Sequence, residues 1–204
     1  MNISIRLEDK NDYRSVENLT REAFWNVYKP GCEEHLIVHK IRNTNAFIEA
    51  LDFVAYDEDK IVGNVIYSKA KVINENNEEF EILCIGPISV LPSYQGKGIG
   101  TLLMNHSIEV AKTLRYKAIA LYGNPDYYHR FGFENAEKYN IQTSSGTNFE
   151  AFMVLELYKG SLKGISGRCY EDSVFKIDEE ELKLFEKEFP YKESIFPKIN
   201  YNIK

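Results

Sequence analysis

Residues able to do chemistry concentrate in one short segment, Gln95-Gly-Lys-Gly-Ile-Gly-Thr101, which places glycines at three alternate positions. Glycine adopts positive φ and lets another atom approach the main chain closely. An apolar run precedes the segment and an amphipathic run follows it, which predicts a turn from a strand into a helix. The backbone N–H groups and the helix start would favour a bound phosphate. A simple packing turn explains the glycines alone equally well.

Two common phosphate-binding motifs do not match this segment. A P-loop needs Ser or Thr directly after its lysine, whereas Lys97 lies between two glycines. A dinucleotide-binding fingerprint has the spacing GxGxxG, and an acidic residue ends its next strand. Here the spacing is GxGxG, and Ala118 to Leu121 ends without an acidic residue.

Hydrophobic periodicity predicts the elements that position this segment. The predicted strands cover residues 3–7, 53–56, 61–67, 80–90, 118–121 and 150–158. The predicted helices start near Tyr13, cover 33–42, follow the glycines to Leu114 with His106 as a core residue, and run from Asn124 to Arg130. The strand at 118–121 is expected to be parallel to the one before the glycines, which gives a βαβ unit.

The texture of the sequence changes after residue 159. Glycines at 160, 164 and 167 predict a flexible stretch, and 178–188 reads as a charged helix. We therefore predict an α/β domain over 1–159 and a C-terminal extension over 160–204, packed on or near the acceptor side of the site.

Composition limits the classes of partner. The net charge is −6 and no Lys/Arg run is present, which argues against a nucleic-acid partner and favours a cationic substrate such as an amine. Cys32, Cys84 and Cys169 show no pairing or metal-ligand pattern, which predicts a reduced, cytoplasmic protein without a metal. Since no apolar run reaches 18 residues, no membrane partner is expected either.

The segment resembles the Q/R-x-x-G-x-G/A signature of the GNAT superfamily of acyl-CoA N-acyltransferases, with Gln95, Gly98 and Gly100 at the defining positions. The later run Tyr127-Tyr-His-Arg-Phe-Gly-Phe133 is similar to the family's Y-x-x-x-G-F motif. The resemblance covers about residues 3 to 158 and is greatest to the bacterial "predicted N-acetyltransferase" branch. It implies a mixed, mostly antiparallel sheet with a splayed parallel strand pair and flanking helices.

The resemblance implies acetyl-CoA as cosubstrate and assigns residues to it. Loop amides would hold the pyrophosphate, and these come from Gln95, Gly96, Lys97, Gly98, Ile99, Gly100 and Thr101. The backbone of Ile88, Ser89 and Val90 would pair with the pantetheine arm, next to a bulge or a simple kink at Gly86-Pro87. Asn124 would reach the arm from the other side, or act only as a helix N-cap.

The chemistry implied is direct attack of an amine on the thioester. Tyr128 aligns with the family's tyrosine acid, which would protonate the departing thiolate; the alternative is that its ring only packs. The position where a glutamate base is expected is occupied by Cys84. Glu33, Glu34 and His35 belong to the acceptor region or to helix surface, so we assign no base.

We therefore predict an acetyl-CoA-dependent N-acetyltransferase acting on a small primary amine, as a monomer or homodimer. Two alternatives stay open: acetylation of a protein N-terminus or lysine, and an acyl-CoA-binding sensor without turnover.

Overall fold

The computed structural model describes residues 1–196. Residues 197–204, the end of the predicted extension, lie outside the described residues. The α-helices are α1 (Tyr13–Phe24), α2 (Glu34–Ile41), α3 (Ile99–Thr113), α4 (Pro125–Tyr128) and α5 (Glu179–Glu186). The strands are β1 (Ile3–Leu7), β2 (Phe47–Asp57), β3 (Lys60–Ile73), β4 (Glu79–Val90), β5 (Ala118–Tyr122), β6 (Glu134–Asn135), β7 (Ile141–Gln142), β8 (Phe152–Glu156) and β9 (Gly167–Tyr170).

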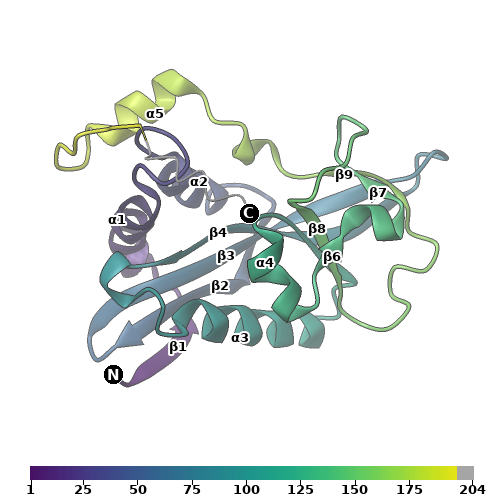
Figure 1. Cartoon of the computed structure of the whole chain (residues 1–204), viewed down its shortest axis with the longest axis horizontal. Coiled ribbons are helices and arrows are strands. Elements are labelled where there is room, and N and C mark those ends of the chain that lie inside the picture. The colour runs from purple at the N-terminus through teal and green to yellow at the C-terminus, as the bar shows by residue number, and fades with distance from the viewer. Residues whose placement is uncertain (197–204) are drawn as a thin grey trace.

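One twisted sheet carries the fold, with the strand order β1-β2-β3-β4-β5-β8-β6. Along this path every neighbouring pair is antiparallel except β4 and β5. In Figure 1, α3 lies on one side of the sheet, and α1, α2 and α5 lie on the other. The predicted fold class, a mixed and mostly antiparallel sheet with flanking helices, is confirmed.

The parallel pair β4–β5 separates soon after it forms. The two strands pair only at Leu83 with Ile119 and at Cys84 with Ala120, although β4 continues to Val90. On its other edge β4 has one residue more than β3 in the stretch between Ile85 and Ile88, which is the bulge expected at Gly86-Pro87. The separation leaves one backbone edge of β4 without a strand partner beyond Cys84.

Helix α3 buries only part of the stripe that its spacing predicts, namely Ile99 and Leu103. Its buried residues are Ile99, Leu103, Met104, Ser107, Ile108 and Ala111. Leu102 and Leu114 are exposed instead. His106, predicted to be a core residue, is also exposed, and its ring meets the Phe53 ring edge-on at 4.7 Å. Apolar residues occupy two adjacent stripes of this helix, and only packing against the sheet selects between them.

The chain after β8 adds a strand and a helix to the fold. Strand β9 pairs with Lys71–Ile73 of β3, just beyond Ser68, where the pairing of β3 with β2 ends. Gly167 permits this pairing, because a Cβ there would lie 2.1 Å from the Ile73 carbonyl oxygen. Periodicity predicts no strand after residue 158, because β9 is only four residues long and begins at this glycine. Helix α5 then packs beside α1 and α2 (Figure 1).

A buried charge cluster attaches α1 and α2 to the sheet. The Arg42 guanidinium lies 2.6 Å from a Glu8 carboxylate oxygen and 3.2 Å from one of Glu17. All three side chains are almost fully buried. Asp52 lies within the same cluster, and burial, followed by the Glu8 carboxylate, raises the pKa of Asp52.

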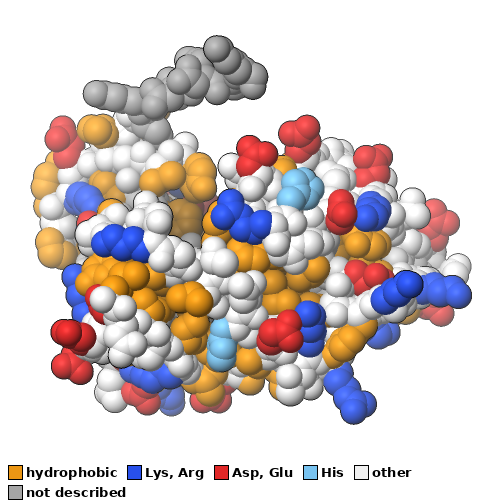
Figure 2. Space-filling model, turned by 60° about the horizontal axis from the view of Figure 1, so that its bottom comes forward, with side chains coloured by type: hydrophobic (Ala, Val, Ile, Leu, Met, Phe, Trp, Pro, Cys, Tyr) orange, Lys and Arg blue, Asp and Glu red, His pale blue; other side chains and the backbone are white. Residues whose placement is uncertain are grey.

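Both signs of charge occur on the face of the molecule drawn in Figure 2. In Figure 2, acidic and basic side chains are interspersed among hydrophobic ones on the face turned forward. This face therefore has no basic stripe of the kind that a phosphodiester backbone binds. Within residues 1–196, no helix has the length and apolarity needed to cross a membrane. Over the same residues, no three His, Cys, Asp or Glu side chains cluster as metal ligands would.

Candidate active site

A cavity of about 1410 Å³ lies at the place where β4 and β5 separate. One side, here called the glycine-turn wall, consists of its lining residues from β4, the turn before α3, and α4. The opposite side, here called the α1–α2 wall, consists of Phe24, Tyr28, Glu34, Ile37, Glu171 and Phe175. The cavity is larger than ordinary small-molecule pockets, so it has room for a large cosubstrate and a second reactant.

The glycine turn has the backbone geometry of an anion cradle. Gly96 and Gly98 have φ of 73° and 85°, in the left-handed region that favours glycine. Gly98 is also the N-cap of the fifteen-residue helix α3. The Gln95 side-chain amide donates to the Val90 carbonyl at 3.0 Å and so fixes the turn against β4. The partial positive charge of the α3 start therefore faces the cavity along with the turn.

Tyr127 closes the glycine turn from the α4 side. A Cβ on Gly100 would lie 2.6 Å from the Tyr127 hydroxyl, so a larger residue at this position would displace the Tyr127 side chain. Burial raises the pKa of the Tyr127 phenol, and the nearby Arg130 and a hydrogen bond with Thr101 act in the opposite direction. The Arg130 guanidinium lies 4.7 Å from the centre of the Tyr127 ring. This end of the cavity is therefore cationic and rich in hydrogen-bond donors.

Tyr128 ends α4 and belongs to the glycine-turn wall. Its ring packs on Gly123, where a Cβ would be 2.2 Å from a ring carbon, and meets the rings of Tyr127 and Phe133 edge-on. Burial raises the pKa of the Tyr128 phenol, and the neighbouring Tyr127 and Tyr28 raise it further. The hydroxyl consequently stays protonated at neutral pH and is suited to donate a proton.

The α1–α2 wall carries carboxylates among aromatic side chains. Glu34 stands in the first turn of α2, and burial raises the pKa of its carboxyl. Glu171 follows β9 and accepts a hydrogen bond of 3.3 Å from the Tyr122 hydroxyl. Together with Phe24, Tyr28 and Phe175, these groups suit a cation with an apolar body. The two ends of the cavity therefore differ in sign.

The α1–α2 wall is held from behind by α5. The Arg21 guanidinium is buried and donates to both carboxylate oxygens of Glu186, at 2.9 and 3.1 Å. It also donates to the Pro190 carbonyl at 3.1 Å and stacks on Trp25. His35 is fully buried, with its Nε2 3.1 Å from a Glu186 oxygen. Glu186 thus forms an ion pair with α1 and lies in contact with α2.

Comparison with known families gives a consistent result. The family model described as "Acetyltransferase (GNAT) domain" matches residues 50–135, which span β2 to β6 and include the glycine turn and Tyr128. The curated "Uncharacterized N-acetyltransferase YhbS" of Escherichia coli is 26% identical over 163 residues, or 80% of this chain and 92% of that protein. Residues 50–135 of the chain are therefore a GNAT acetyltransferase domain.

Solved GNAT structures share the arrangement of the elements. The structure of Escherichia coli YhbS in complex with CoA superposes with a TM-score of 0.77 at 26% identity, covering 87% of this chain and 93% of that one. A GNAT acetyltransferase from Brucella melitensis in complex with acetyl-CoA gives 0.69 at 25% identity, over 85% and 98% of the two chains. The recognition of a GNAT fold from the sequence is confirmed.

The structure brings most of the predicted site residues of this GNAT chain to one cavity. Ten of them line it: Ile88, Val90, Gln95, Gly96, Gly98, Ile99, Gly100, Thr101, Asn124 and Tyr128. Asn124 also caps α4, accepting from the Asp126 N–H at 2.9 Å. Ser89 and Lys97 do not line the cavity. The Ser89 hydroxyl donates to Thr20 on the α1 side, and the Lys97 ammonium donates to the Ser93 carbonyl at 2.8 Å.

Three residues considered for the base, Cys84, His35 and Glu34, are all at least partly buried. Cys84 is buried, and burial raises the pKa of its thiol well above the usual range, so the thiol stays protonated. His35 is fully buried and Glu34 lines the cavity. Neither residue is therefore on the solvated surface of its helix, which was one of the two interpretations from the sequence.

Several lining residues gave no recognisable signal in the sequence. Glu171 and Phe175 come from the segment after β9, and Tyr122 and Gly123 end β5. The glycine that follows a short buried strand was the one available clue, because it makes room for the Tyr128 ring. Nothing local marks Glu171, since its position depends on the pairing of β9 with β3.

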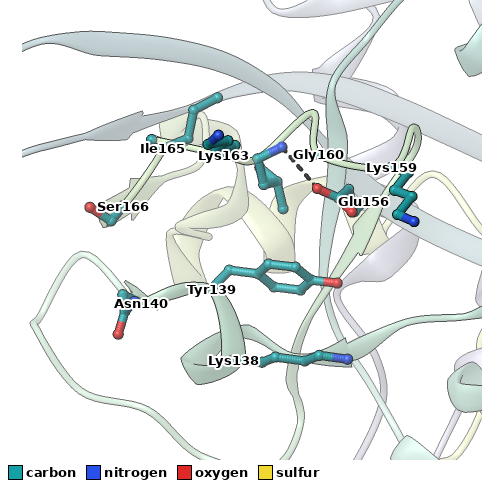
Figure 3. A pocket seen from close by; sticks show the side chains of 11 residues that line it. Lys138, Tyr139, Asn140, Glu156, Lys159, Gly160, Lys163, Ile165 and Ser166 are labelled. Atoms are coloured by element: carbon teal, nitrogen blue, oxygen red, sulfur yellow. Dashed lines mark hydrogen bonds between the residues drawn. The ribbon is translucent and has the colours of Figure 1, made fainter.

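A second, smaller pocket lies elsewhere on the chain. Its volume is about 610 Å³, and Lys138, Tyr139, Lys159 and Lys163 are among its lining residues (Figure 3). The Glu156 carboxylate accepts the Leu162 N–H at 3.0 Å and so ties the loop at its rim. It contains none of the predicted site residues.

Proposed function

We propose that the chain transfers an acetyl group from acetyl-CoA to a primary amine of a small molecule, by direct attack within a ternary complex. The observation that carries this proposal is the single cavity that joins the glycine turn, Tyr128 and the carboxylates of the α1–α2 wall. The CoA and acetyl-CoA complexes of the two GNAT relatives support the choice of cosubstrate.

Each wall has a task in this scheme. Backbone amides of residues 95–101 and the α3 start bind the pyrophosphate, and the unpaired edge of β4 beyond Cys84 pairs with the pantetheine arm. A β4 amide at this edge stabilises the charge that develops on the carbonyl oxygen during attack. Tyr128 donates its proton to the departing thiolate.

The acceptor side favours a small amine over a protein chain. The segment 160–204, which we treat as an extension of the 1–159 domain, contributes Glu171 and Phe175 and holds the α1–α2 wall through Glu186. This covering narrows the acceptor side, and its carboxylates attract a cation. The expected location of this reaction is the cytoplasm.

Two measurements test the proposal. Thermal-shift titration should show stabilisation by acetyl-CoA and CoA, weaker stabilisation by dephospho-CoA, and none by pantetheine alone. A thiol-release assay over a panel of small primary amines should show acetyl-CoA consumption with at least one of them. No stabilisation by CoA overturns the cosubstrate assignment, and CoA binding without consumption by any amine favours a sensor.

A further inference from the structure

The attack on the thioester needs a proton acceptor. An alkyl amine has a pKa near about 10, so at pH 7 almost all of it is an ammonium ion without a free electron pair. The carboxylates that line the cavity are Glu34, Glu150 and Glu171. Cys84, at the strand position where a base was expected, keeps its thiol proton. A side chain that accepts this proton must therefore come from an element other than β4.

Glu171 lies where β4 and β5 part. Its carboxylate meets the hydroxyl of Tyr122, the last residue of β5, and it lines the cavity together with Cys84 of β4. Cys84 belongs to the last residue pair formed between β4 and β5. Glu171 thus lies where the separation of β4 and β5 begins, on the side from which an acceptor amine would approach the thioester.

Tyr122 fixes the Glu171 carboxylate. The Tyr122 hydroxyl donates to Glu171 Oε2 at 3.3 Å, and both residues line the cavity. The Tyr122 ring is itself held by stacking on Phe149 and Phe152, with centroids 5.9 and 5.0 Å away. This bond occupies one carboxylate oxygen and leaves the other for an ammonium group.

The other two carboxylates suit the role less well. One oxygen of Glu34 accepts the Glu33 backbone N–H at 3.0 Å, so this side chain serves the start of its own helix. Glu150 is exposed, in the turn before β8. Among the described residues, Glu171 is therefore the cavity carboxylate held by another cavity side chain.

We propose that Glu171, supplied by the C-terminal extension, is the general base that removes a proton from the acceptor ammonium, and that Tyr122 positions it. This inference rests on the proposed function. The carboxylate takes one proton from R–NH₃⁺, and the free amine forms the C–N bond at the thioester carbonyl. The C–S bond then breaks, and Tyr128 donates its proton to the sulfur. The phenolate left on Tyr128 takes up the second proton from the nitrogen. Glu171 releases its proton to water.

The test compares Glu171→Gln with the wild type by thiol release, using the best amine of the panel. At pH 7 we expect kcat/KM for the amine to fall about 100-fold or more. Wild-type kcat/KM should change little across neutral pH, whereas that of E171Q should rise about tenfold per pH unit towards the pKa of the amine. A purely structural change would lower the rate equally at every pH.

Two controls separate the possible outcomes. Glu75→Gln removes a carboxylate in the turn between β3 and β4 and should behave as wild type. Tyr122→Phe should lower kcat/KM by less than E171Q, because the carboxylate remains. The assignment to Glu171 is overturned if E171Q keeps the pH profile of the wild type, or if Glu34→Gln loses that profile instead. CoA stabilisation that persists in E171Q shows that the cosubstrate site is intact, and if no amine is consumed by the wild type, both proposals fall.

Discussion

The two walls of the cavity are built by different physical means. The glycine-turn wall comes from a nearly continuous stretch, β4 to α4, and its functional groups are backbone amides whose directions are set by φ and by a helix start. The α1–α2 wall combines residues separated by more than a hundred positions, and its functional groups are side chains. Salt bridges and hydrogen bonds such as Arg21 to Glu186 hold it together.

This difference indicates which parts of the molecule tolerate substitution. A backbone cradle binds the cosubstrate, which every acetyl-CoA-dependent transfer shares. Its sequence must therefore supply residues that can adopt the required φ, rather than particular side chains. A wall of side chains can be altered residue by residue without disturbing the cradle. We therefore expect acceptor choice to depend on the α1–α2 wall, and the cosubstrate site to survive most substitutions there.

The largest expected effect concerns Tyr128 of the glycine-turn wall. Tyr128→Phe keeps the ring packed on Gly123 but removes the proton donor, so kcat should fall about 100-fold or more. Thiol release at saturating acetyl-CoA measures this, while CoA should stabilise the variant as it stabilises the wild type. Tyr139→Phe, which removes a hydroxyl outside the cavity, is the matched control. Unchanged turnover in Y128F would retract the role of Tyr128 as the acid.

The next effect separates the walls by stability. Glu186→Gln removes the nearer counter-ion of the buried Arg21 and leaves only Glu22 at 3.8 Å. The free energy of unfolding should fall by about 2 kcal/mol, because Glu186 is itself 28% exposed. Thermal unfolding should then shift down by about 4–8 °C. We expect KM for the amine to rise and KM for acetyl-CoA to stay unchanged.

Glu181→Gln is the control for this substitution within α5. Its partner Lys40 is partly exposed, so the loss should be below about 1 kcal/mol. Equal losses in E186Q and E181Q, or a change in KM for acetyl-CoA alone, would contradict the idea that α5 holds the α1–α2 wall.

A smaller effect is expected in the glycine-turn wall. Gly98→Ala forces a Cβ into the left-handed region, which should cost about 1–2 kcal/mol of stability. Stabilisation by acetyl-CoA should weaken with it, because the amides of the turn change direction. Gly160→Ala imposes the same strain, with φ of 85° and no atom near the added Cβ, but lies outside the cavity. Equal loss of acetyl-CoA binding in both variants would show that the effect is not local to the turn.

The last effect is a pH dependence, the smallest of these when taken over a single pH unit, and it concerns the buried charge cluster under the α1–α2 wall. Because the pKa of Asp52 is raised, the folded chain retains a proton that the unfolded chain releases above pH about 4. The free energy of unfolding should therefore fall by up to about 1.4 kcal/mol per pH unit as pH rises above 4, until the raised pKa is passed. Denaturant unfolding should show this slope in the wild type and lose it in Asp52→Asn. Asp59→Asn, in the exposed β2–β3 turn, should keep the slope.

The sequence by itself determined the glycine-turn wall. Strand, turn and helix follow from β-branched runs, from glycines at alternate positions and from helical spacing, all of which act within about twenty residues. The Tyr128 position followed from a family motif, and ten of the twelve predicted residues line one cavity. These signals are local, so a sequence pattern carries them.

Only the tertiary structure decided the α1–α2 wall. Glu171 reaches the gap because β9 pairs with β3 beyond the end of β2, and Glu186 meets Arg21 across 165 positions. The buried stripe of α3 was likewise selected by the sheet rather than by its own periodicity. Contacts between segments so far apart depend on chain closure and mutual packing, which leave no periodic trace in either segment.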